Sequence, residues 1–100
     1  MALYKRIISE NGIVSYYHVI QQVYLDKDGN LDILVNHYAD EHYRKENADN
    51  PVGTDFYYGS VGKPSVSFEE AYTVLKSLEI FEGAEDVVEQ EVTDESDTND

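Results

Sequence analysis

The sequence contains no cysteine and no tryptophan. Without cysteine it cannot form disulfides, iron–sulfur clusters, cysteine-ligated zinc sites or a catalytic thiolate. The lack of tryptophan argues against an extracellular sugar-binding module. No apolar run approaches the roughly 18 residues that a membrane-spanning helix needs. Because no apolar run follows Lys5 and Arg6, we also expect no secretory signal.

Basic residues are scarce, because seven Lys and Arg face 21 Asp and Glu, for a net charge of −14. Residues 82–100 carry nine of these acids and no base, which leaves residues 1–81 with a charge of −5. These like charges repel one another. Because no aromatic residue follows Phe81, the segment also has too little apolar area to offset the entropy that ordering the chain would cost. We therefore predict a single α+β domain over 1–81 and an acidic, disordered tail over 82–100. A tail that docks on a basic surface is the alternative.

Alternating apolar residues predict an antiparallel β-meander. Asn11-Gly12 is typical of a type I′ hairpin turn, and Asp28-Gly29 lies in a second turn. Apolar residues on both faces of the second segment predict a central strand that is covered on each side. The four predicted strands cover residues 3–9, 13–25, 31–38 and 56–61.

Helix signals follow the third strand and, more clearly, the fourth. Asp40 is a candidate N-cap for a short helical turn that runs to Glu46. Ser67 and Glu70 form an S-x-x-E capping box before an apolar stripe at helical spacing, which predicts a helix over about residues 68–79. The predicted fold is a small antiparallel β-meander of about four strands with one C-terminal helix packed on a face.

Oxygen-bearing side chains alternate around the second turn in a pattern that suggests calcium. They are Asp26, Asp28, Asn30 and Asp32. A calcium loop of the EF-hand type needs glycine at its sixth position and glutamate at its twelfth, but these positions hold Leu31 and His37. Because the pattern fails at both positions, we interpret this segment as a hairpin turn without a metal.

Histidines give no catalytic pattern either. His37, Glu41 and His42 miss the H-x-x-E-H spacing by one residue and lack a third ligand. His18 is expected to be a hydrogen-bonded histidine within the sheet. The sequence has no Walker A loop and no G-x-S-x-G elbow. We therefore predict that the protein is not an enzyme and uses no cofactor.

Tyrosine is abundant, with nine residues in 100. Tyrosine suits half-buried sheet faces and also protein interfaces, because its ring can be buried while its hydroxyl stays hydrated. Tyr57 and Tyr58 are adjacent on a predicted strand and must point to opposite faces. At least one of them should therefore be exposed, and both are candidate partner-binding residues.

Motifs spread along the chain suggest a family. The segments are Met1-Ala2-Leu3-Tyr4 with Asn11-Gly12, Tyr17-His18, Arg44-Lys45-Glu46, and Ala71-Tyr72 with Leu75-Lys76 leading to Phe81-Glu82-Gly83-Ala84-Glu85-Asp86. Over most of residues 1–86 the chain resembles small proteins encoded in the tail-gene region of phages and prophages of Gram-positive bacteria. The resemblance implies a virion or virion-assembly role and supplies no site residues. The acidic extension past Asp86 departs from the pattern.

Two functional hypotheses follow. The first is a structural or assembly protein of a phage tail or baseplate, located in the virion or in the host cytoplasm during assembly. It would bind other virion proteins, would contact neither nucleic acid nor membrane, and is compatible with a homo-oligomer. The alternative is an acidic DNA mimic or inhibitor that occupies a basic cleft of a host nuclease or defence protein. A mimic needs its carboxylates on the folded body.

Overall fold

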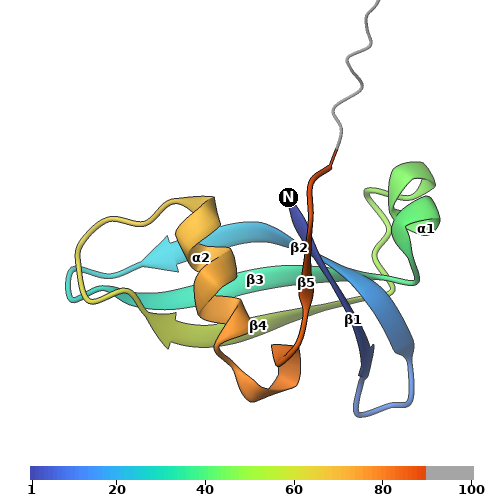
Figure 1. Ribbon diagram of the computed structural model, residues 1–100, viewed down its shortest axis with the longest axis horizontal. Coiled ribbons are helices and arrows are strands. Elements are labelled where there is room, and N and C mark those ends of the chain that lie inside the picture. The colour runs from blue at the N-terminus through green and yellow to red at the C-terminus, as the bar shows by residue number, and fades with distance from the viewer. Residues whose placement is uncertain (90–100) are drawn as a thin grey trace, which may run out of the picture.

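The structure, a computed structural model, describes residues 1–89 as one five-stranded antiparallel sheet with two α-helices (Figure 1). The strand order is β4-β3-β2-β1-β5, which places β2 in the middle. The elements are β1 (Ala2–Ile8), β2 (Val14–Leu25), β3 (Asn30–Tyr38), α1 (Glu41–Glu46), β4 (Gly53–Ser60), α2 (Phe68–Lys76), the 3₁₀ turn η1 (Glu79–Phe81) and β5 (Glu85–Val87). The predicted antiparallel meander with a packed helix is confirmed at this level.

Both predicted hairpins form, but the type I′ turn at Asn11-Gly12 is wrong. A type I′ turn needs positive φ at both central residues, and of this pair only Gly12 has it, with φ of 85°. Gly12 N–H donates to the carbonyl of Ser9, and Gly29 N–H donates to that of Asp26. Each hairpin thus has a longer loop with a left-handed glycine, a known alternative to the two-residue turn.

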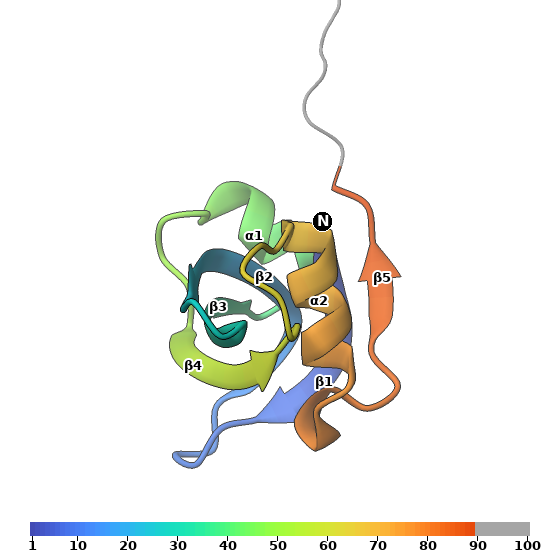
Figure 2. The ribbon, with the colours of Figure 1, turned by 90° about the vertical axis from the view of Figure 1, so that its left-hand side faces the viewer.

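The main core lies between α2 and one face of the sheet, which we call the inner face. Figure 2 shows the sheet curled, with α2 against its concave side. The central members of this core are Leu3, Ile20, Leu31, Ile33, Val35, Ala71, Tyr72, Leu75 and Phe81. The helix approaches β4 so closely that a Cβ at Gly59 would lie 2.3 Å from a methyl group of Val74. Glycine is therefore needed at this position for the helix to pack.

Within residues 1–89, the opposite, outer face is covered at one end only. There Ala2, Tyr17 and Tyr38 form a second buried cluster, and Tyr43 of α1 packs against it. Asp40 caps α1 by accepting a hydrogen bond from the backbone of Tyr43, as predicted. The central strand β2 is thus covered on both faces here, by the main core on one side and by α1 on the other.

Strand β5 overturns the predicted boundary at residue 81. Residues 82–89 belong to the fold, because Glu85–Val87 pair with β1 at the edge of the sheet. Backbone pairing does not depend on side-chain charge, and the acids find partners: Asp86 bonds the ammonium of Lys76 at 2.9 Å. Glu89 accepts a hydrogen bond from the buried Tyr17 hydroxyl at 2.9 Å. The remainder of the predicted tail, residues 90–100, lies outside the described residues.

Two further boundaries differ from the prediction. The capping box of Ser67 and Glu70 is present, but α2 ends at Lys76 and is followed by η1 and β5, so it is not C-terminal. Strand β4 begins at Gly53 rather than residue 56, because β3 continues to pair with it as far as His37. Within residues 1–89, no helix is both long and apolar enough to cross a membrane.

Candidate functional site

The two tyrosines predicted to bind a partner do point to opposite faces. Tyr57 lies opposite Ile33 and packs its ring against Phe81, with 5.0 Å between ring centroids. Tyr58 is on the outer face and leaves 64% of its surface exposed. The expectation that one of the pair is exposed is confirmed, and the exposed residue is Tyr58. Tyr57 is half-buried and takes part in a different site.

Tyr58 belongs to a cluster of apolar side chains at the uncovered end of the outer face. Tyr24 and Tyr58 both pair with Asp32 of the strand between them, so the three lie in one row across the sheet. Phe56 pairs with Leu34 in the next row, and its ring centroid is 6.1 Å from that of Tyr24. Tyr24, Leu34, Phe56 and Tyr58 form what we call the outer aromatic patch.

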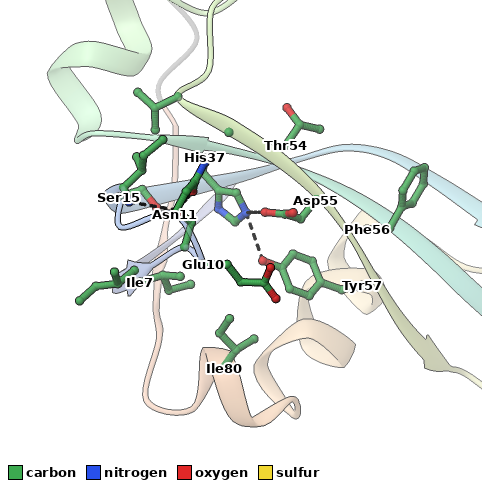
Figure 3. A pocket seen from close by; sticks show the side chains of 15 residues that line it. Ile7, Glu10, Asn11, Ser15, His37, Thr54, Asp55, Phe56, Tyr57 and Ile80 are labelled. Carbon is green, nitrogen blue, oxygen red and sulfur yellow. Dashed lines mark hydrogen bonds and ion pairs between the residues drawn. The ribbon is translucent and has the colours of Figure 1, made fainter.

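A cleft of about 730 Å³ lies at the other end of β4, between the β1–β2 loop, the start of β4 and η1 (Figure 3). Its polar centre consists of His37, Asp55 and Tyr57, whose side chains point toward one another. The Nε2 atom of His37 is 3.1 Å from the Tyr57 hydroxyl and 3.1 Å from an Asp55 carboxylate oxygen. Phe56, although adjacent in sequence, points away from His37.

His37 is the second member of a buried histidine pair. His18 and His37 are opposite each other in β2 and β3, and their Nδ1 atoms are 2.8 Å apart. The Nε2 of His18 lies 2.7 Å from the carbonyl oxygen of Lys5. Both histidines are almost fully buried, so each ring nitrogen needs a partner, and each has one.

The partners determine where the protons sit. A carbonyl oxygen can only accept, so Nε2 of His18 carries a proton and donates it to Lys5. In neutral His18 the Nδ1 atom must then accept, so Nδ1 of His37 donates to it. In neutral His37 the Nε2 atom is consequently an acceptor, and the Tyr57 hydroxyl is the donor that reaches it. The hydrogen bonds therefore form one chain in which every group donates toward Lys5: Tyr57 donates to His37, His37 to His18, and His18 to the Lys5 carbonyl.

Burial favours the neutral form of both rings. Burial lowers the pKa of His18 to about 4; the hydrogen bond to the Lys5 carbonyl opposes this shift, and the neighbouring His37 adds to it to a lesser degree. Desolvation also lowers the pKa of His37, although the Asp55 carboxylate opposes this shift. Burial, together with Asp55, raises the pKa of the Tyr57 hydroxyl to about 12, so Tyr57 remains a donor at neutral pH.

The chain of hydrogen bonds through Tyr57, His37 and His18 does not include a serine hydroxyl within residues 1–89. Ser15 is buried and lines the same cleft, yet no hydrogen bond between its hydroxyl and His37 occurs among residues 1–89. A serine activated by histidine needs that bond. The geometry forms a cleft with an apolar wall and a few convergent polar atoms, a composition that is typical of ligand pockets.

The other residues considered from the sequence have local structural roles. Asp26 accepts hydrogen bonds from the backbone of Asp28 and Asn30 and from the Asn30 side chain, so its carboxylate closes the β2–β3 turn. His42 is exposed on α1, 3.4 Å from Glu46, and is not brought together with His37. No three His, Asp or Glu side chains within residues 1–89 are grouped to hold a metal ion.

Sequence reasoning missed the pairing of His18 with His37 and the position of Asp55. The turn at 26–30 alone would place residue 18 opposite residue 38, and a β-bulge between Ile20 and Gln22 shifts the register by one, so that His37 lies opposite His18. The approach of Asp55 could not be read from the sequence either, because β4 was expected to begin one residue after it.

Comparison with known proteins gives no relative: no family model, no curated protein and no solved structure matches the chain. The function must therefore be argued from the outer aromatic patch, the cleft and the distribution of charge.

Proposed function

We propose that this protein acts by binding another protein through the outer aromatic patch, and that the partner is a structural or assembly protein of a phage tail or baseplate. The observation that carries the first part is the exposure of Tyr24, Phe56 and Tyr58, which are 48%, 46% and 64% accessible on one sheet face. The second part rests on the resemblance to proteins of the phage tail-gene region.

Aromatic side chains in this arrangement are typical of binding surfaces. Tyrosine and phenylalanine are enriched at interfaces, where a rigid ring buries a large area at a low entropic cost. Phe56 and Tyr58 also lie on β4, which is an edge strand of the sheet. A partner could therefore cover the rings and approach the free strand edge at the same time.

The net negative charge of the described residues is the observation that supports the acidic mimic as the second candidate function. Residues 1–89 carry sixteen acidic and seven basic residues, so they hold a charge of −9 of the total −14. Four of the nine acids assigned to the tail, namely Glu82, Glu85, Asp86 and Glu89, belong to the described fold. Two of these, however, are paired with basic groups: Asp86 with Lys76, and Glu89 with Arg44. These two are therefore poorly placed to replace phosphates.

A pull-down from phage-infected lysate separates the two candidates. Wild type, Tyr24→Ala and Tyr58→Ala are compared at low and high salt, and captured proteins are identified by mass spectrometry. Phe68→Ala is the matched control, because Phe68 is a similarly exposed aromatic residue on α2, outside the patch. We expect a phage tail or baseplate protein that persists in high salt, is depleted by both patch variants and is retained by Phe68→Ala.

Two outcomes would contradict the proposal. Capture of a host nuclease or defence protein that is released by high salt would support the acidic mimic, because screening weakens charge-driven binding. Equal capture by Tyr58→Ala and Phe68→Ala would show that the outer aromatic patch is not the interface.

A further inference from the structure

The cleft beside His37 has an apolar rim that the fold does not use. Three isoleucines, Ile8, Ile13 and Ile80, are exposed by 51%, 42% and 42%, and all three line this cleft. They come from β1, the β1–β2 loop and η1, which are separate parts of the chain. A folded protein that gathers its exposed isoleucines around one cleft offers an apolar contact surface there.

The polar centre of the cleft is short of one proton. With His18 and His37 neutral, the Tyr57 hydroxyl supplies the only proton shared by the Tyr57 oxygen, His37 Nε2 and the Asp55 carboxylate. An Asp55 oxygen nevertheless lies 3.1 Å from the same Nε2 atom, so two acceptors face each other. Nε2 already accepts the Tyr57 proton, so the carboxylate is the group without a donor, and one further donor placed against Asp55 would satisfy it.

The charges around the cleft select a cationic donor. The charged residues that line it are Asp55 and Glu10, and neither lysine nor arginine is among the lining residues. The ammonium of Lys5, which lies on the adjacent strand β1, instead donates to the carbonyl of Glu82. A cation that enters the cleft thus meets two carboxylates without competition from a basic residue of the lining.

We propose that this cleft binds the ammonium or guanidinium group of a lysine or arginine side chain from a partner protein, with its aliphatic stem on the isoleucine rim and its charge on Asp55. The chemistry of the ligand follows from the cleft itself. Its source in a protein rests on the proposed function, in which the chain acts by protein binding. The polar centre of the cleft lies on the opposite face of β4 from the outer aromatic patch, because Asp55 and Phe56 point to opposite faces, although Phe56 also borders the cleft.

Binding of the cation should depend on pH. A proton on His37 would let Nε2 donate to Asp55, and this satisfies the carboxylate that the ligand needs. The titratable groups that contact His37 or line its cleft are His18 from β2, Asp55 and Tyr57 from β4, and Glu10 from the β1–β2 loop; from η1, Ile80 lines the cleft. Protonated His37 and the cationic ligand would compete for the Asp55 carboxylate, so acid should weaken binding.

The test is a titration of the full-length protein followed by NMR, with Nα-acetyl-arginine methylamide and Nα-acetyl-lysine methylamide as probes. Nα-acetyl-norleucine methylamide is the neutral probe. We expect saturable shifts of backbone amides around Ile13, Asp55 and Ile80 with the cationic probes only. Asp55→Asn should weaken binding about fivefold or more, as loss of a charge-assisted contact does. Binding by wild type should weaken as the pH falls below 6.5 and through the lowered pKa of His37.

Asp32→Asn is the matched control, because it removes the same charge from an exposed aspartate on the outer face. Equal weakening by the two substitutions would overturn the inference, since it would show general attraction to an acidic protein. Equal binding of the norleucine probe would overturn it as well. Neither result would bear on the proposal that the outer aromatic patch binds a partner. Conversely, the capture of a partner by Tyr58→Ala would not bear on the proposal that the cleft binds a cation. The two proposals can therefore fail separately.

Discussion

The two faces of the sheet differ in how completely they are covered. On the inner face α2 and η1 cover a continuous core, beside which lies a buried, mutually bonded histidine pair whose His18 packs on Phe81. On the outer face α1 covers Tyr17 and Tyr38 at one end, while Tyr24 and Tyr58 stay exposed at the other. The same residue type is therefore part of a buried cluster at one end and exposed at the other.

The difference arises from the length of the covering elements. Helix α2 has nine residues and carries an apolar stripe along the sheet, whereas α1 has six and no buried residue of its own. A short helix can shield only the strands beneath it. Tyr24 and Tyr58 are therefore exposed because no element of residues 1–89 covers their end of the outer face.

The largest expected effect tests the inner face. Phe81→Ala should destabilise the protein by about 3–5 kcal/mol, because Phe81 is fully buried against His18 and Tyr57 and its loss leaves a cavity. Phe68→Ala, which removes an exposed phenylalanine, should change stability by less than about 0.5 kcal/mol. Denaturant unfolding of both variants measures the difference. Similar losses from the two would mean that the inner face is not the main core.

The second prediction concerns the histidine pair. The folded pKa values of His18 and His37 lie below the unfolded value of 6.5, so the fold keeps both rings neutral. The stability that depends on neutral rings is complete above pH 6.5 and is lost as the pH falls toward 4. From the shift of His18 to about 4, this loss amounts to roughly 2–3 kcal/mol.

Unfolding between pH 7.5 and pH 4.5 measures it. His18→Gln keeps a side chain that can both donate and accept, and it should lose less stability over this range than wild type does. His42→Gln should lose as much as wild type, because His42 is exposed on α1. Parallel curves for all three proteins would show that the buried histidines do not titrate on unfolding.

Much of the inner face could be predicted from the sequence, because its signals are local. Glycine turns, alternation of apolar residues and the capping box of Ser67 and Glu70 each act within a few residues and are present in the fold. Strand β5 was not predictable in this way. Its pairing with β1 joins Ala2 to Val87, a contact across almost the whole described chain, and acidic composition gives no hint of it.

The same distinction holds for the candidate site: features that depend on local sequence could be predicted, and features that depend on contacts between distant segments could not. The exposure of one member of the Tyr57–Tyr58 pair followed from strand geometry alone. Which of the two is exposed depended on the position of Phe81, which packs on Tyr57 from a distant part of the chain. The cleft depended in turn on the approach of η1 and the β1–β2 loop to β4, and no local pattern encodes that approach.

The smallest expected effect compares the two ends of the outer face directly. Tyr17→Phe removes only the hydroxyl that donates to Glu89, at the covered end. Glu89 also pairs with Arg44 at 3.3 Å, so the deleted bond is one of several that tie residues 82–89 to the domain. Loss of a hydrogen bond to a charged acceptor should cost about 1–2 kcal/mol.

Tyr58→Phe makes the same chemical change at the open end. The Tyr58 side chain is mostly exposed, so we expect a change within about 0.5 kcal/mol. Thermal and denaturant unfolding of the two variants, measured beside wild type, gives both values. If Tyr17→Phe were as stable as wild type, the hydrogen bond from Tyr17 to Glu89 would contribute nothing to stability, and residues 82–89 would be held by the backbone pairing of β5 and by their other contacts, such as those of Asp86 and Arg44. If Tyr58→Phe were the more destabilised of the two, the end of the sheet that we describe as open would be the covered one, and the outer aromatic patch would lose its claim as a binding surface.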